Sequence, residues 1–180
     1  MICILLFLTG CGGNDGLADE AMDLRNKLLS GNGCSFDAVV TADYGDRLYT
    51  FGMHCCMDKN GTVTFSVTEP ETIEGITGTL SEASGKLTFD DKILAFEMLA
   101  DGQITPVSAP WHMLRALRSG YLRGCGKAGD GLLLMIDDSY MGDNLQANIY
   151  LNADILPEAC ELYWKERRFM TIAVTNFEIL

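Results

Sequence analysis

The sequence predicts an α+β fold in which roughly ten antiparallel strands are combined with two helices. Two observations support this prediction. From residue 34 onward, most of the chain alternates apolar and polar residues, which is typical of strands that bury one face. Helical periodicity is confined to residues 17–30 and 106–120. Many short alternating strands indicate a sandwich or a barrel, and the two amphipathic helices are available to cover one face of the sheet.

The first residues read as a lipoprotein signal. Residues 2–8 are uninterrupted apolar, and Leu-Thr-Gly-Cys follows at 8–11, which resembles the bacterial lipobox. In that motif the cysteine thiol receives a diacylglyceryl group, and cleavage leaves Cys11 as the new N-terminus. A buried apolar strand with an incidental cysteine is the alternative. No Lys or Arg precedes the apolar run, so we expect the true start to lie upstream or the sequence to be clipped.

These motifs divide the chain into three parts. We expect residues 1–10 to be the signal peptide, residues 11–17 to be the lipidated cysteine and a Gly-rich tether, and residues 18–180 to form one domain. The diacylated cysteine would hold this domain outside the cytoplasm on a bacterial cell membrane. The net charge of −12 argues against nucleic acid as a partner, because phosphate binding needs clustered Lys and Arg.

The first helix is predicted over residues 17–30. Acidic residues lie near its start and glycines follow its end, as is typical of helix termini. One face carries the apolar residues Leu17, Ala21, Leu24 and Leu28.

Residues 34–56 predict a β-hairpin. A two-residue loop places Phe36 opposite Met53 and Cys34 opposite Cys55, and it keeps the apolar residues of both strands on one face.

The rest of the chain predicts further strands around the second helix. In that helix, over residues 106–120, Ser108 can cap the start, Pro110 suits the first turn and Gly120 ends it. The further strands are expected at 61–69, 76–82, 85–90, 93–99, 121–125, 131–138, 145–151, 159–165 and 168–177.

This order of elements, together with three stretches of sequence, carries a resemblance to a known family. The stretches are an F-x-V-x-x-P-x-x-I-x-G-I run from Phe65 to Ile76, the Pro110-Trp111 helix start, and the ending at 150–180 with its Leu-Pro step and final Asn-Phe. They resemble the LolA/LolB-like outer-membrane lipoprotein carrier superfamily, and within it the Gram-positive lipoproteins that include germination lipoproteins. The resemblance covers nearly all of residues 18–180.

The resemblance implies a particular form of the fold. In that superfamily a strongly curved antiparallel β-barrel of about 10–11 strands stays unclosed, helices cover its concave face, and acyl chains lie between them. Eight apolar side chains could line such a space, although packing as ordinary core is the alternative. They are Phe36, Phe51, Phe65, Phe89, Phe96, Trp111, Leu114 and Leu117.

The stretch GMHCCMD at 52–58 raises the question of disulfides. In an oxidising compartment the predicted hairpin favours a Cys34–Cys55 bridge, with Cys34–Cys56 as the alternative. Cys125 and Cys160 could form a second bridge. Buried, unbridged cysteines are the other interpretation.

The same stretch does not predict a metal centre or a redox site. His54 and Cys56 share one face of a strand, and no further motif supplies the other ligands of a zinc site, so no metal or cofactor is predicted. The Cys-Cys pair is not a C-x-x-C motif, which argues against a thiol-redox role. We expect His112 to be a surface or lid residue.

Three functions are compatible with these patterns. The first is a tethered carrier, chaperone or sensor that holds an acyl chain, a lipid or a lipidated partner in an apolar cavity. The second is an interaction protein of the envelope, sporulation or germination, with a filled core and no small ligand. An enzyme is the weakest, because no catalytic motif is present. An open apolar cavity would favour the first function, and a packed core the second.

Overall fold

The structure, a computed structural model, describes residues 15–82, 84–89, 92–96, 99–100, 103–138 and 145–180. The side chains of residues 95–96, 99–100 and 103 are outside this description, and so are Cys11 and the expected signal peptide. The elements in chain order are α1 (Asp15–Ser30), β1 (Gly33–Asp43), β2 (Leu48–Asp58), β3 (Val63–Glu69), β4 (Thr77–Leu80), β5 (Gly85–Phe89), β6 (Lys92–Phe96), β7 (Leu99–Ala100), β8 (Gln103–Ile104), the 3₁₀ turn η1 (Pro106–Ser108), α2 (Ala109–Ser119), β9 (Tyr121–Ala128), β10 (Gly131–Asp137), β11 (Leu145–Leu151), β12 (Pro157–Trp164) and β13 (Arg167–Ile179).

Eleven of the described strands form one antiparallel sheet that is not closed. Its order is β6-β5-β4-β3-β2-β1-β13-β12-β11-β10-β9, so β6 and β9 are its two edges. The first strand of the chain therefore pairs with the last, and each half of the sheet is a meander leading away from that pair. This arrangement confirms the predicted α+β open half-barrel. The short β7–β8 ribbon is a separate sheet that the sequence did not predict.

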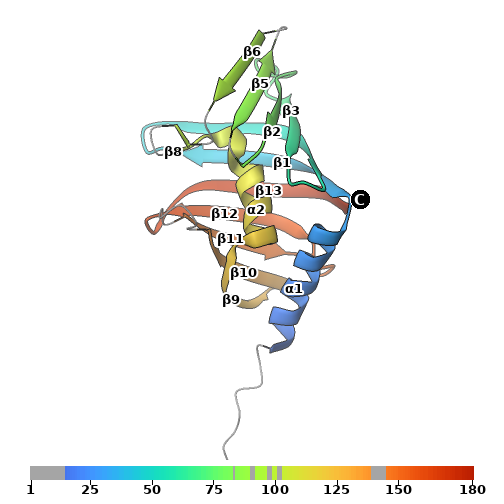
Figure 1. Ribbon diagram of the computed structural model, residues 1–180. Helices are drawn as coiled ribbons and strands as arrows, with labels where there is room; N and C mark the ends of the chain where they lie inside the picture. Colours follow the sequence, from blue (N-terminus) through green and yellow to red (C-terminus); the bar gives the residue numbers. More distant parts are fainter. Residues whose placement is uncertain (1–14, 83, 90–91, 97–98, 101–102, 139–144) are drawn as a thin grey trace, which may run out of the picture.

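Both helices lie on the same face of the sheet (Figure 1). α2 crosses the middle of that face and contacts β10 to β13, whereas α1 contacts β9, β1 and α2. Residues alternate between buried and more exposed along β1 to β3 and β10 to β12, as expected for strands with one covered face. The inward side chains and α2 form one hydrophobic core. None of the described helices is long and apolar enough to span a membrane.

The turn between β1 and β2 differs from the prediction. Asp43 pairs with Leu48, so the turn holds the four residues between them instead of two. Tyr44 N–H donates to the carbonyl of Arg47 at 3.0 Å, and Gly45 has φ +94°. A two-residue hairpin turn of type I′ needs positive φ at both central residues, and Tyr44 is poorly suited to that conformation.

The longer turn shifts the whole hairpin register by two positions. Cys34 faces Met57 and Cys55 faces Phe36, which corrects the predicted Cys34–Cys55 and Phe36–Met53 pairs. Because side chains alternate with a period of two, the predicted inner and outer faces of both strands are unchanged.

The second helix begins later than predicted, after a 3₁₀ turn. Ser108 occupies the N-cap position of α2 but makes no capping hydrogen bond. Its Oγ instead donates to the carbonyl of Thr105 at 2.8 Å, which stabilises the 3₁₀ turn. Gly120 ends the helix, as predicted, and its N–H donates to the carbonyl of Ala116.

Candidate functional site

Six of the eight side chains predicted to line a cavity pack together in one hydrophobic core. Each is at most 7% exposed; they are Phe36, Phe51, Phe65, Trp111, Leu114 and Leu117. Phe89, contrary to prediction, is 45% exposed, because the β5–β6 end of the sheet extends beyond α2 (Figure 1). The side chain of Phe96 lies outside the described part.

α2 is buried around most of its circumference. Its buried residues are Ala109, Pro110, Trp111, His112, Met113, Leu114, Ala116 and Leu117. Such a helix belongs to the core of the molecule and is not merely a cover lying on it. Three of the six predicted cavity residues, Trp111, Leu114 and Leu117, belong to α2 itself, and the other three lie on strands in the same hydrophobic core.

A cleft of about 250 Å³ opens on one side of α2. It lies where α1, the β2–β3 turn and the β4–β5 turn approach that helix. The apolar part of its wall comprises Leu29, Met57, Trp111 and Leu114, and Arg115 and Arg118 are its cations. Two of the predicted cavity residues, Trp111 and Leu114, thus border an open space.

Arg118 supplies the cleft with an unused hydrogen-bond donor. Its Nη2 donates to the carbonyl of Lys59 at 3.1 Å, while its Nε is buried and has no partner among the described residues. Gly61 makes room for the guanidinium, because a Cβ at that position would overlap with Nη1. A buried N–H without an acceptor costs free energy, which an acceptor placed next to it would recover.

Arg115, one helical turn earlier, is already paired. Its Nη2 lies 2.7 Å from Asp138 Oδ2, and the Asp138 side chain is 1% exposed. Its guanidinium carbon also lies 5.0 Å from the ring centroid of Trp111. Burial raises the pKa of Asp138, and the hydrogen bond and charge of Arg115 oppose that shift. Arg115 is therefore a paired part of the cleft wall, whereas Arg118 is the cation that no described carboxylate pairs.

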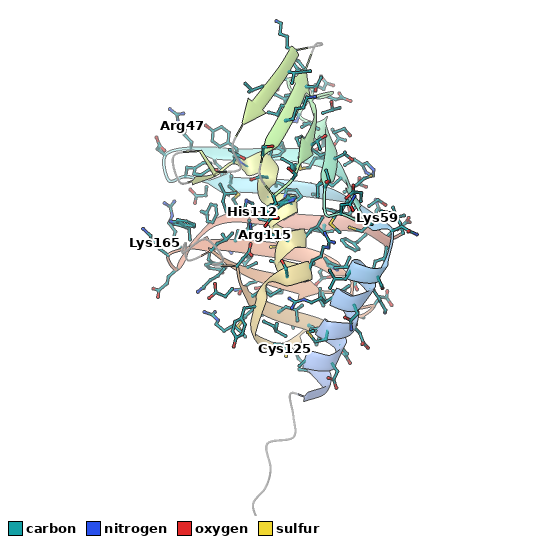
Figure 2. All side chains as sticks on the ribbon, viewed as in Figure 1. Arg47, Lys59, His112, Arg115, Cys125 and Lys165 are labelled. Carbon is teal, nitrogen blue, oxygen red and sulfur yellow. The ribbon has the colours of Figure 1, made fainter. Side chains whose placement is uncertain are left out.

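His112 is buried, which corrects the expectation of a surface or lid residue. It is 4% exposed, and neither ring nitrogen has a hydrogen-bond partner in the described structure. Burial, together with the nearby Arg115, lowers the pKa of His112 to about 3. The imidazole is therefore neutral at physiological pH. Figure 2 shows His112 and Arg115 on α2, between the ends of the hairpin marked by Arg47 and Lys59.

The predicted disulfides are not formed in the structure. None of the five described cysteines is in a disulfide. Cys125 on β9 pairs with Leu134 on the neighbouring strand β10, and Cys160 on β12 pairs with Ile149 on β11. Three strand spacings therefore separate Cys125 from Cys160, about 14 Å, against a limit of about 7 Å for a bridge. For Cys34 with Cys55, the observed register removes the direct opposition on which the prediction rested.

Sequence reasoning missed the charged side of the site. Arg115 and Arg118 are three residues apart and interrupt the apolar pattern of the helix, which is a usable signal. The contacts of Arg118 with the β2–β3 turn carry no sequence signal, because 59 residues separate it from Lys59.

No family model and no curated protein matches the chain. Similar solved structures include a LolA superfamily protein from Nitrosomonas europaea, which is 9% identical with a TM-score of 0.47 over 91% of this chain and 93% of that one. An uncharacterized conserved protein from Thermus thermophilus is 12% identical, with a TM-score of 0.49 over 91% and 88%. A chain in the Clostridioides difficile complex of the CwlD amidase with the GerS lipoprotein is 16% identical, with a TM-score of 0.43 over 89% and 94%. These are likenesses of fold, and the open half-barrel itself is established by the strand order from β6 to β9.

Proposed function

We propose that this chain is an extracytoplasmic lipoprotein that binds an amphiphile with an acidic head in the cleft beside α2. The amphiphile is a lipid, a free acyl chain or the lipidated end of a partner protein. The observation that carries the proposal is the lining of the cleft, in which the apolar side chains Leu29, Met57, Trp111 and Leu114 lie beside Arg118, and polar residues with one acid, Glu82, complete the wall. A partly apolar wall beside a cation whose charge no described carboxylate pairs suits a hydrocarbon tail with an anionic head.

The size of the cleft limits how much of the ligand is enclosed. Its volume of about 250 Å³ lies below the usual range of enclosed small-molecule sites, about 300–1,000 Å³. Buried side chains of the core fill the space deeper under α2. The cleft therefore holds the head and the first part of a chain.

Membrane attachment in this proposal comes from the lipid on Cys11. The net charge of −12 disfavours direct adsorption on anionic headgroups, so the domain needs a covalent anchor to stay near the membrane.

The decisive experiment compares two probes that differ only in their head. Dansyl-labelled undecanoic acid and its uncharged primary amide are titrated against the protein, and affinity is read from dansyl fluorescence. Arg118→Gln is expected to weaken binding of the acid about tenfold and to leave the amide within about twofold, because only the acid brings a negative charge for the guanidinium to pair with, and the Gln side chain can still donate to the uncharged amide. Leu29→Gln, in the apolar wall, weakens both probes.

Two controls separate binding from folding. Arg47→Gln changes an arginine with a 71% exposed side chain in the β1–β2 turn, away from the cleft, and is expected to leave both affinities unchanged. Unfolding midpoints of all variants show whether the fold is retained. Absence of binding by the parent protein, or equal loss of acid and amide in Arg118→Gln, would contradict the proposal.

A second candidate function is docking of a protein partner of the envelope, sporulation or germination. It is favoured by the packed core and by exposed apolar residues on the edge pair β5–β6, where Ile93 is 63% and Leu94 is 62% exposed. A photo-crosslinking residue at position 93 should give one defined adduct in cells. The same residue at Leu48, which is 69% exposed in β2, is the matched control and should give none.

A further inference from the structure

A linked set of four side chains lies on the outer face of the sheet, opposite the helices. Cys56 Sγ is 3.4 Å from His54 Nε2, and His54 Nδ1 is 2.7 Å from Asp37 Oδ1. Asn176 Nδ2 donates to the second carboxylate oxygen of Asp37 at 2.8 Å. The order thiol, imidazole, carboxylate is the one in which an imidazole activates a nucleophile and a third group orients it.

The corrected hairpin register brings these residues together. Asp37 on β1 faces His54 on β2, and Cys56 lies two residues further along the same face of β2. Asn176 has φ +53°, and the β1–β13 register shifts between Ser35 and Asp37. Such an irregularity re-aims a side chain, and here the Asn176 amide reaches Asp37.

The contacts of Asp37 fix the tautomer of the imidazole. Hydrogen bonds from Asn176 and His54 lower the pKa of Asp37, so it is a carboxylate that accepts the Nδ1 proton. With Nδ1 as donor, Nε2 is the acceptor that faces the thiol.

An open groove of about 400 Å³ lies over His54 and Cys56. The strand pairs place Thr64, Thr79 and Lys86 in one row with Cys56, each on the next strand of the sheet. Three strand spacings put the Lys86 backbone about 14 Å from that of Cys56, and the lysine side chain can shorten this gap. The groove thus has a thiol at one end, hydroxyl groups along it and a cation at the other.

We propose that Cys56 is a reactive thiol that undergoes exchange with small disulfides bearing a carboxylate, with His54 as its base and Asp37 as a positioning residue. Hydroxyl groups and one cation suit a polar, anionic reactant better than an acyl chain. The site is on the other face of the sheet from the α2 cleft and does not depend on the proposed amphiphile binding.

The exchange is balanced without a further reagent. Cys56 gives its S–H proton to His54 Nε2, and the thiolate attacks one sulfur of the disulfide R–S–S–R. A protein–S–S–R bond forms as the original S–S bond breaks, and the leaving thiolate takes the proton from His54 as R–SH. The protein thiol is oxidised, and one half of the small disulfide is reduced.

Three of the other described cysteines, Cys34, Cys55 and Cys160, are buried, whereas Cys56 is partly exposed. Burial raises the pKa of Cys34 to about 12 and raises the pKa of Cys55 and Cys160 further above the usual range. Cys125 is partly exposed, as Cys56 is, but it lies on β9 at the far edge of the sheet. It is therefore the matched control thiol.

The test follows the reaction of the native protein with dithionitrobenzoate, a disulfide with two carboxylates. The full chain carries Cys3→Ser and Cys11→Ser, so that thiols outside the described residues do not contribute. One fast thiol is expected in this parent and in Cys125→Ser, and it should be absent in Cys56→Ser. His54→Gln should slow it about tenfold near neutral pH, where a thiol without a base is mostly protonated.

Two further measurements separate chemistry from structure. The rate in His54→Gln and Asp37→Asn should keep rising with pH where the parent levels off, which a purely structural role would not produce. Lys86→Gln should slow dithionitrobenzoate about threefold and leave the uncharged 2,2′-dithiodipyridine unchanged, because only the former carries charge for the lysine to attract. A fast phase that survives Cys56→Ser, or a His54→Gln rate equal to that of the parent, overturns the proposal.

Discussion

The buried imidazole of His112 determines how one part of the stability depends on pH. An ordinary histidine takes up a proton near pH 6.5, whereas burial lowers the pKa of His112 to about 3 in the folded state. Between these values the unfolded chain binds the proton and the folded chain does not, so stability falls as the pH falls through this window. Above pH 6.5 this contribution is fully present.

His112→Leu should therefore remove an acid sensitivity. Over the interval from pH 7 to pH 4, we expect the parent to lose about 3 kcal/mol more unfolding free energy than the variant, because each unit of pKa shift is worth about 1.4 kcal/mol. Urea unfolding at both pH values measures the difference. Arg47→Gln, which changes an exposed arginine in the β1–β2 turn, is the control and should keep the acid sensitivity of the parent. Equal losses in the parent and His112→Leu would contradict the assignment.

The ion pair of Arg115 with Asp138 is the other buried interaction whose contribution to stability depends on pH. Arg115→Gln leaves the carboxyl of Asp138, 1% exposed, without its cation. We expect a loss of about 3 kcal/mol at pH 7, in line with other broken buried pairs. Because removal of Arg115 lets burial raise the pKa of Asp138 further, the carboxyl takes up a proton more readily, and the loss should shrink as the pH falls toward 4. Denaturant titrations of Arg115→Gln and of exposed Arg123→Gln test this, and a loss independent of pH would refute it.

At the level of secondary-structure elements, Arg25 joins the two helices. Its Nε donates to the carbonyl of Leu117 at 2.7 Å, and its Nη2 donates to the carbonyl of Gly120 at 2.8 Å. The last carbonyls of a helix have no partner within the helix and carry the negative end of its dipole. A guanidinium from α1 therefore satisfies and neutralises the C-terminus of α2.

Arg25→Met should destabilise the protein by about 2 kcal/mol through the lost charge-assisted hydrogen bonds. Lys27→Met, an exposed change on the same helix, should cost less than about 0.5 kcal/mol. Thermal and urea unfolding of both variants provide the comparison, and similar losses for the two would contradict the role given to Arg25.

The elements themselves were largely predictable from local pattern. Helical and alternating periodicity located the N-terminal helix, the helix before β9 and the strands of the large sheet, because the first helix and most of the strands bury one face and the second helix is flanked by clear start and stop residues. The hairpin register was not predictable, since it depends on a turn whose length the pattern of apolar residues leaves open. With a two-residue loop Asp37 faces Gly52, and with the observed turn it faces His54. Because the predicted register was wrong, the contact between Asp37 and His54 on the outer face could not be predicted. Asn176, which also contacts Asp37, is 139 residues away from it in the sequence.

For the molecule as a whole, the register predicts a stability that does not depend on redox conditions. Cys34, Cys55 and Cys160 are buried thiols whose pKa values burial raises, so they contribute as small apolar side chains. We expect dithiothreitol to leave the unfolding midpoint unchanged within about 1 °C, since no bridge closes a loop between the five described cysteines. In the native chain these three thiols should resist iodoacetamide and react after unfolding, which peptide mapping by mass spectrometry can follow. A midpoint that falls on reduction would contradict this account.

The direction of α1 also bears on where a ligand comes from. The helix starts at Asp15, beside the β9 edge, and ends near the C-terminus of the chain (Figure 1). Leu29 of the cleft is thus about 21 Å along the helix axis from its start, at 1.5 Å per residue. With Cys11 anchored in a bilayer and α1 perpendicular to the membrane, the cleft lies away from the bilayer and meets only amphiphiles that have already left it. A reclining domain would bring a surface of net charge −12 against anionic headgroups, which repel it. The proposed anchor and the proposed ligand together predict that the cleft accepts molecules in transit, handed over by another carrier or shed from the leaflet, and does not extract them itself.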